Sequence, residues 1–222
     1  MRTVRLQYAT QKFSGFTALL ALIQAAGWPI WPLIIASILA LAITFERFYS
    51  LRRNMVIPAG LLDRTLDELR RHVPTPEWLR VLSEGSPMGC ILVAGIRNIS
   101  APREVMKEAL EETGRAVAHD LDRYLLSLGT IAAVAPLMGL FGTVIGMVEI
   151  FGSQSPTGGN PAVLAHGISV ALYNTAFGLM VAIPSLIFHR FFRGRVEAYL
   201  VEMEQQAIRM VEIVHGERRA PA

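Results

Sequence analysis

The sequence predicts an all-α integral membrane protein with three transmembrane helices and long cytoplasmic helical extensions. The 222 residues are 52% hydrophobic and only 18% charged, whereas charged residues make up about a quarter of an ordinary soluble domain. The mean hydropathy is +0.41. The charged residues flank long apolar segments instead of alternating with them, which is the pattern of helices that cross a bilayer.

The charge and residue types argue against several other classes of protein. The formal net charge is +3, but the basic residues form no stripe with interleaved aromatic residues, so we expect no nucleic-acid partner. The five histidines are scattered, and no cluster has the spacing of a metal site or catalytic centre. We therefore expect no enzyme activity, metal or cofactor. The single cysteine, Cys90, is expected to be a small buried apolar side chain.

The N-terminal residues 1–27 are predicted to be an amphipathic segment at the membrane surface. Basic residues precede an apolar stretch from Phe16 to Ala26. A secretory signal peptide is the alternative, because Gln24-Ala25-Ala26 could be a cleavage site. We favour a retained segment, since small and polar residues interrupt the apolar core.

The first predicted span covers residues 28–50. Pro29 and Pro32 lie at its start, where missing amide hydrogens cost a helix least, and no charge follows until Glu46. Aromatic residues at both ends suit the headgroup level: Trp28, Trp31, Phe48 and Tyr49.

Residues 51–123 are predicted to form a cytoplasmic helical domain. Leucines recur at helical spacing, Pro74 and Pro76 end one helix, and Gly85-Ser86-Pro87 ends the next. The periodic stretch from Arg103 to Leu128 predicts a helix that runs straight into the second span.

Spans two and three are predicted at residues 124–151 and 161–192, joined by a Gly/Pro-rich periplasmic loop at 152–160. Residues 193–222 are predicted to continue the third span as a cytoplasmic helix and tail. Apolar residues recur there at alternating steps of four and three: Val196, Leu200, Met203, Ala207, Met210 and Val214. This coiled-coil-like seam predicts packing against copies of the chain.

Basic residues flank the same end of all three spans, and the loop at 152–160 has neither Lys nor Arg. By the positive-inside rule, the basic end is cytoplasmic. Arg2, Arg5 and Lys12 oppose this orientation but are outnumbered.

The polar residues of spans two and three form the candidate functional site. Their middles contain no Asp or Glu, and Glu149 lies near one end. A proton path would therefore have to borrow a carboxylate from a partner helix. Thr143 and Thr175, with Asn174, are the predicted polar points of a pore wall. The alternative is that each threonine only bonds the carbonyl one turn back in its own helix.

Small residues are predicted to let the membrane helices approach closely, as in the GxxxG pattern of Gly142 and Gly146. The predicted packing positions are Pro136, Gly139, Gly142, Gly146, Gly178 and Pro184.

Several stretches resemble the MotA/TolQ/ExbB proton-channel family, most closely ExbB. They are the runs from Pro136 to Val144, from Gly167 to Leu179 and from Val181 to Pro184, with the span-one exit from Phe45 to Arg53. The likeness extends from about Trp28 to Gly216.

The resemblance implies a homo-oligomer, a pentamer, around the membrane helices of an ExbD-like single-span partner whose aspartate carries the proton. It implies a bacterial inner-membrane protein with a periplasmic N-terminus that passes motion to a TonB-like protein powering outer-membrane uptake. Thr143 and Thr175 match the family's lumen threonines. Val170 stands where relatives commonly have glutamate.

Three alternatives remain at this level: a TolQ-like role in envelope maintenance, a MotA-like flagellar stator, and a non-conducting membrane scaffold. Three spans and one large inter-span domain favour ExbB or TolQ over MotA.

Overall fold

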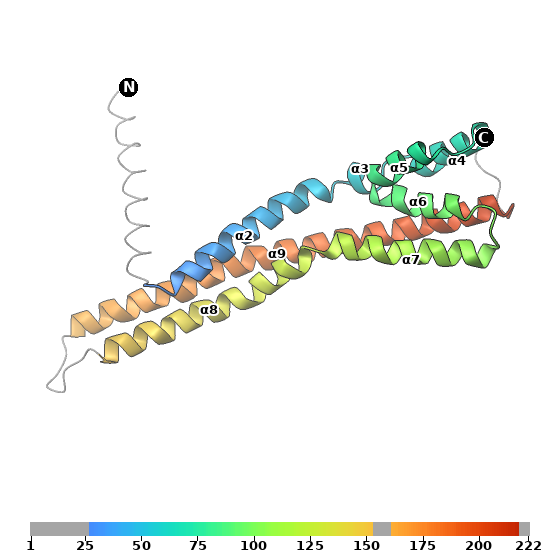
Figure 1. Cartoon of the computed structure of the whole chain (residues 1–222). Coiled ribbons are helices and arrows are strands. Elements are labelled where there is room, and N and C mark those ends of the chain that lie inside the picture. Colours follow the sequence, from blue (N-terminus) through green and yellow to red (C-terminus); the bar gives the residue numbers. More distant parts are fainter. Residues whose placement is uncertain (1–26, 153–160, 218–222) are drawn as a thin grey trace, which may run out of the picture. The chain divides into compact units, whose positions relative to one another are not determined.

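The computed structural model describes residues 27–152 and 161–217. Every regular element in this part of the chain is a helix (Figure 1). The elements are α2 (Ile30–Ser50), α3 (Arg53–Val56), α4 (Leu61–Arg71), α5 (Pro76–Gly85), α6 (Pro87–Arg97), α7 (Arg103–Asp122), α8 (Leu125–Gly152) and α9 (Pro161–Val214). The predicted all-α class is confirmed. The predicted amphipathic segment, most of the loop at 152–160 and the end of the tail lie outside the described residues.

Three of the described helical stretches are long and apolar enough to cross a membrane: Ile30–Ser50, Arg103–Gly152 and Leu164–Val214. The mean hydropathy of their most apolar windows is 1.7, 2.1 and 1.7, respectively. The predicted number of spans is confirmed for the described part of the chain. The exact residues within the bilayer remain a prediction.

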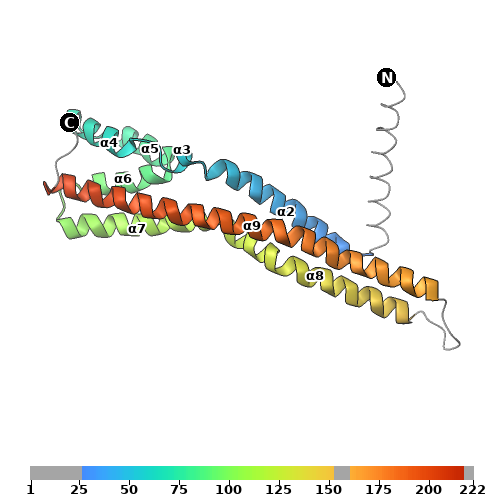
Figure 2. The same ribbon diagram turned by 180° about the vertical axis from the view of Figure 1, so that it is seen from behind.

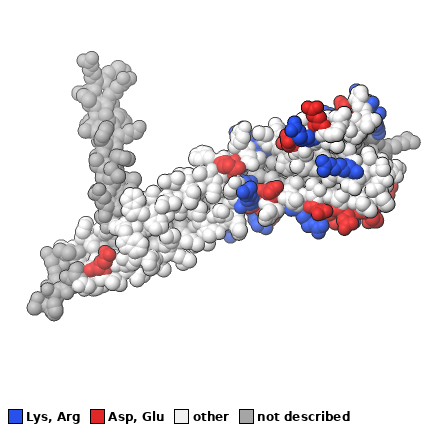
Figure 3. All heavy atoms as spheres, viewed as in Figure 1, with Lys and Arg blue, Asp and Glu red and all other residues white. Residues whose placement is uncertain are grey.

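The chain divides into two compact units, which we describe separately. The apolar unit comprises residues 1–42 and 128–187, and the charged unit comprises residues 43–127 and 188–222. Figure 3 shows Lys, Arg, Asp and Glu gathered over the charged unit and an almost uncharged surface over the apolar unit.

In the apolar unit, parts of α2, α8 and α9 lie side by side (Figures 1 and 2). Leu33 of α2 is fully buried at the centre of the core. It packs with residues from both neighbouring helices: Ala135, Val181 and Ala182, surrounded by Ile131, Met138 and Phe177. Leu33 thus belongs to a core that contains residues of α2, α8 and α9.

In the charged unit, α4 and α5 end before the prolines predicted to end them, and α5 and α6 begin at Pro76 and Pro87, each after a hydroxyl residue. Thr75 Oγ1 accepts a hydrogen bond of 3.3 Å from the amide of Trp78. Ser86 Oγ accepts one of 3.1 Å from the amide of Gly89. Each cap satisfies an amide at a helix N-terminus, next to a proline that has no amide hydrogen to satisfy.

α9 is one helix of 54 residues, so its predicted continuation beyond the third span is confirmed. The structure differs from the prediction for the apolar seam on this helix. Val196, Met203 and Met210 are at most 1% exposed within the single chain. A Cβ added to Gly95 of α6 would lie 2.8 Å from the sulfur of Met210. These three residues pack against the chain's own helices, so the prediction that they pair with copies is wrong.

The predicted passage from α7 into the second span holds as one helical stretch from Arg103 to Gly152, but a two-residue turn interrupts it, because α7 ends at Asp122 and α8 begins at Leu125. Arg47 of α2, only 3% exposed, donates a 3.0 Å hydrogen bond from Nη1 to the carbonyl of Leu121. Its guanidinium carbon lies 4.8 Å from the ring centroid of Tyr124. The break therefore has a side-chain donor for a carbonyl at the end of α7.

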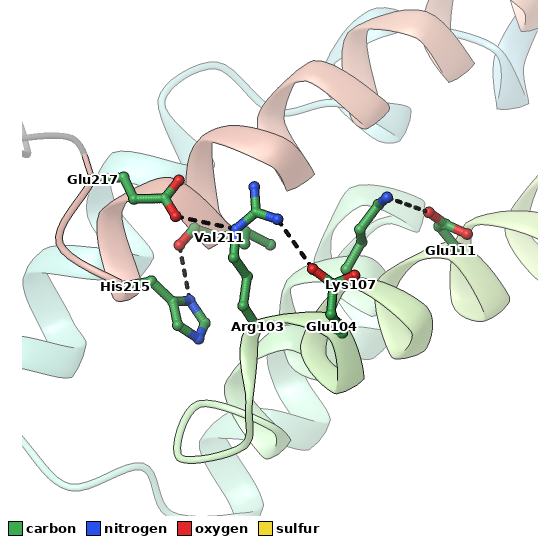
Figure 4. A network of polar contacts seen from close by, with 7 residues as sticks. All are labelled: Arg103, Glu104, Lys107, Glu111, Val211, His215 and Glu217. Carbon is green, nitrogen blue, oxygen red and sulfur yellow. Dashed lines mark hydrogen bonds and ion pairs between the residues drawn. The ribbon is translucent and has the colours of Figure 1, made fainter.

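Polar contacts join α9 to the other helices of the charged unit. Tyr199 donates a 3.0 Å hydrogen bond to the carbonyl of Leu51, and Arg209 lies 3.0 Å from a carboxylate oxygen of Asp63. Where α7 begins, Arg103 contacts Glu104 and Glu217 at 3.3 and 3.2 Å (Figure 4). These exposed pairs each add little stability.

Candidate functional site

The candidate site lies where α8 and α9 meet within the apolar unit. A Cβ added to Gly178 would lie 2.6 Å from the carbonyl oxygen of Ala135. One added to Gly139 would lie 2.7 Å from the carbonyl oxygen of Asn174. These distances leave no room for a side chain, so the two backbones are in direct contact.

The same contacts define how the helices are paired. Gly146 of α8 lies against Ala171 of α9, and Gly167 of α9 lies against Ile150 of α8. Residue numbers rise along one helix as they fall along the other, so α8 and α9 are antiparallel at this interface.

Thr143 and Thr175 meet across the interface. Their hydroxyl oxygens are 2.5 Å apart, and either can be the donor. Thr143 Oγ1 also lies 3.2 Å from the carbonyl oxygens of Gly139, in its own helix, and Ala171, in α9. The local hydrogen bond expected of an ordinary membrane threonine is therefore available, but the hydroxyl also reaches the neighbouring helix.

The hydroxyl pair lies on the side of α8 and α9 that is turned away from α2. Met138 of α8 and Phe177 of α9 pack against the core cluster to which Leu33 of α2 belongs. Thr143 follows Met138 by five residues and Thr175 precedes Phe177 by two. At 3.6 residues per turn, the rotations are about 140° and about 160°. Both hydroxyls thus point away from Met138 and Phe177, and Thr143 is also about 160° around α8 from Phe141, whose ring meets that of Trp28 just before α2.

Asn174 occupies the interface itself. It is 2% exposed, and a Cβ added to Gly142 would lie 2.9 Å from both Cβ and Cγ of Asn174. The next residue, Thr175, is rotated by about 100° along the helix. Asn174 is therefore packed between the helices, whereas the two threonines, each half-buried, lie at the edge of the interface.

The remaining predicted positions are less closely involved. Pro136 is half-buried within α8 and Pro184 is exposed within α9, and both helices continue through them. Val170 is half-buried. The residue that the sequence reasoning missed is Ala171, whose carbonyl accepts from Thr143. Its place four residues before Thr175 is the only signal that the sequence carries for it.

The arrangement can bind through hydrogen bonds but holds no charge at the level of the hydroxyl pair. Glu149 is the only Asp, Glu, Lys or Arg among the described residues of the apolar unit. Among all the described residues, no group of three or more His, Cys, Asp or Glu could hold a metal ion.

The family model of the MotA/TolQ/ExbB proton channel family matches residues 83–205. The chain belongs to this family. The matched residues include α7, α8 and most of α9, so both threonines lie inside the match.

Two relatives of the ExbB type are similar over most of the chain, and a third is similar over a shorter stretch. The Biopolymer transport protein exbB1 of Vibrio cholerae serotype O1 is 30% identical over 170 residues, which cover 73% of this chain and 74% of that protein. The Putative biopolymer transport protein ExbB-like 3 of Synechocystis is 32% identical over 174 residues, covering 77% and 83%. The Biopolymer transport protein ExbB of Salmonella typhimurium is 40% identical over 91 residues, covering 40% and 37%. The predicted resemblance is confirmed: the chain is an ExbB-type membrane channel protein.

Proposed function

We propose that the chain is a subunit of a proton-motive-force-driven motor in the bacterial inner membrane. It forms a pore, as a homo-oligomer and most simply a pentamer, around an ExbD-like single-span partner, and it energises TonB-dependent uptake across the outer membrane. It transports rather than catalyses. The observation that carries this proposal is the Thr143–Thr175 hydroxyl pair, which is turned away from α2.

The argument rests on what the apolar unit lacks. A hydroxyl pair can hydrogen-bond a proton carrier but cannot itself hold the proton at neutral pH. At the level of Thr143 and Thr175, the described apolar unit contains no carboxylate. Ionisable groups inside membranes usually mark ion pathways. We therefore assign the carrier to a membrane aspartate of the partner, facing the surface that α2 leaves open.

The orientation follows from the basic residues. Arg47, Arg52 and Arg53 follow the first span, and Arg190, Arg193 and Arg195 follow the third. With this end cytoplasmic, the C-terminus is cytoplasmic and the N-terminus periplasmic. A proton that enters down a potential of about 100 mV releases about 2.3 kcal/mol, which is available to bias packed helices between two arrangements.

The relatives favour uptake over a TolQ-like envelope role, because those described above are biopolymer transport proteins of the ExbB type. A growth assay in which uptake through outer-membrane receptors is limiting, compared with an assay of envelope integrity, separates the two roles.

The pore-wall assignment is tested by proton flux into vesicles that contain the chain and its ExbD-like partner. We expect Thr143→Val and Thr175→Val to assemble and to reduce flux strongly, and Thr143→Ser to retain it. Ser185→Ala is the matched control, because the Ser185 hydroxyl is buried and donates only to the carbonyl of Val181 in its own helix, at 2.7 Å. Wild-type flux in both valine variants would reject the assignment. A complex that never conducts would instead support a scaffold.

A further inference from the structure

Two ionisable side chains of the apolar unit remain unassigned, and they lie at the same end of it. Its described residues contain no Asp, Lys, Arg or Cys. The side chains there that can titrate are Glu149 of α8, His166 of α9 and the phenol of Tyr173 on α9. Glu149 and His166 are both exposed. Because ionisable groups on membrane helices are expensive and usually functional, these two need an explanation.

Glu149 and His166 lie at one level of the helix pair. A Cβ added to Gly167 would lie 2.6 Å from Cδ1 of Ile150, so these two positions are in contact across the interface. Glu149 immediately precedes Ile150, and His166 immediately precedes Gly167. Both side chains therefore lie in the turns next to the connection between α8 and α9.

They also share a face. Glu149 follows Met138 by eleven residues, and His166 precedes Phe177 by eleven. Eleven residues are about three turns, with a net rotation of only about 20°, and rise by about 16 Å. Glu149 therefore points to the same side of α8 as Met138, and His166 to the same side of α9 as Phe177, the two residues that pack against the core cluster of Leu33.

The described part of α2 does not reach them. The Trp28 ring meets the Phe141 ring edge-on, with centroids 6.4 Å apart. Glu149 lies eight residues beyond Phe141, which is about 12 Å along α8. A carboxylate and an imidazole thus lie at one level of the helix pair, and the described residues of the apolar unit contain no other Asp, Glu, His, Lys or Arg.

We propose that Glu149 and His166 form a proton-collecting site at the loop end of the apolar unit. The inference rests on the proton-motor function and the orientation proposed above, which make this end the periplasmic entrance. A proton from water binds a carboxylate oxygen of Glu149 or a ring nitrogen of His166 and is later released, and no other bond changes. A fixed negative charge raises the local concentration of protons, and histidine side chains change charge between about pH 5 and 8.

The site raises the supply of protons at the loop end but lies on the other side of the helix pair from the hydroxyl pair, so it does not hand protons directly to Thr143 and Thr175. Glu149 is six residues from Thr143, which is about 9 Å along the helix and about 120° around it. Tyr173 lies seven residues after His166, on the same stripe of α9 and two turns nearer Phe177. Its side chain is a phenol, so Tyr173 adds no carboxylate to the pair of Glu149 and His166.

The test is proton flux through the complex of the full chain and its partner in vesicles, with protons supplied from the loop side at pH 8. We expect the double variant Glu149→Gln, His166→Gln to conduct about tenfold less, the low end of what a local charge gives to counter-ion concentration. The deficit should close as the loop-side pH falls. Ser169→Ala is the matched control, because the Ser169 hydroxyl is exposed, lies at the same end of α9 and donates to the carbonyl of Ala165 in its own helix.

A mobile buffer shows whether the double variant conducts less because protons reach the loop end more slowly or because the complex is damaged. Imidazole added on the loop side at constant pH should restore flux in the double variant and leave the wild type unchanged. The proposal is overturned by undiminished flux in the double variant, by a deficit that buffer does not restore, or by wild-type flux that itself rises severalfold with buffer. The wild-type measurement decides the case even where the double variant fails to assemble. A wild-type complex that carries no protons overturns the motor function as well.

Discussion

The two units bury polar groups in opposite ways. In the apolar unit, neutral hydroxyls pair across backbones in contact, as Thr143 and Thr175 do. In the charged unit, a full charge is buried: Arg47 contacts the Leu121 carbonyl, the Tyr124 ring and, at 2.9 Å, a carboxylate oxygen of Glu46. Inside a bilayer a polar group needs a partner in the protein, and for Thr143 the partners are the Thr175 hydroxyl and the carbonyls of Gly139 and Ala171. In the charged unit, one long side chain instead contacts several partners.

Breaking the backbone contact between α8 and α9 should cause the largest loss of stability. Gly178→Ile would place its Cβ 2.6 Å from the Ala135 carbonyl oxygen, and its further atoms would push α8 and α9 apart. We expect a loss of about 3 kcal/mol or more, the upper end for overpacking. The measurement is the thermal unfolding of the purified protein in detergent. Gly194→Ile on the same helix is the control, because nothing lies within 4 Å of a Cβ there. Equal unfolding temperatures would contradict the close approach.

Removing the buried charge should have a smaller effect, confined to the charged unit. Arg47→Met leaves the Leu121 carbonyl without the donor that it has now, which we expect to cost about 1–3 kcal/mol. Arg47→Lys should recover part of the loss. Urea unfolding followed by the fluorescence of Trp78, with the other two tryptophans replaced, reports on this unit alone. The exposed Arg52→Met is the control, and a variant of Arg47 that is no less stable would show that the contact contributes nothing.

The smallest expected effect is on the reactivity of the Cys90 thiol. Cys90 and Arg47 line one pocket of the charged unit. Burial raises the pKa of the Cys90 thiol, and the negative charge of Asp120 raises the pKa further. A raised pKa leaves less thiolate at neutral pH, so alkylation by iodoacetamide should be slow at pH 7 and rise about tenfold per pH unit below the pKa. Asp120→Asn should lower the pKa and speed alkylation at pH 8. A rate that is already at its plateau at pH 7 would contradict this.

Much of the fold could be predicted because length and composition govern it. Runs without charge predict α2, α8 and α9 whatever they pack against. Pro74, Pro76 and Gly85-Ser86-Pro87 predict where two helices end, and α4 does end at Arg71 and α5 at Gly85. The seam of Val196, Met203 and Met210 was misassigned because its spacing is the same whether the partner helix belongs to the same chain or to a copy.

Contacts between distant residues could not be predicted. At the α7–α8 break, the Leu121 carbonyl accepts a hydrogen bond from Arg47, which lies 74 residues away in the sequence. Thr143 and Thr175 could be chosen as polar points, but their hydrogen bond depends on the register of α8 against α9. That register follows from where Gly139 and Gly178 let the backbones touch, and many glycine positions in the sequence would allow other registers.

Either hydroxyl can donate in the hydrogen bond between Thr143 and Thr175. Thr143 has one hydrogen, so it donates to Thr175 only when it does not donate to the carbonyl of Gly139 or Ala171. Rotation about the two Cβ–Oγ bonds exchanges the roles of donor and acceptor without moving a heavy atom. The pair can therefore offer a hydrogen to a carboxylate or a lone pair to a carboxylic acid. Its polarity would follow the protonation state of the group that approaches it, so the same two residues could serve the carrier both before and after it takes up a proton.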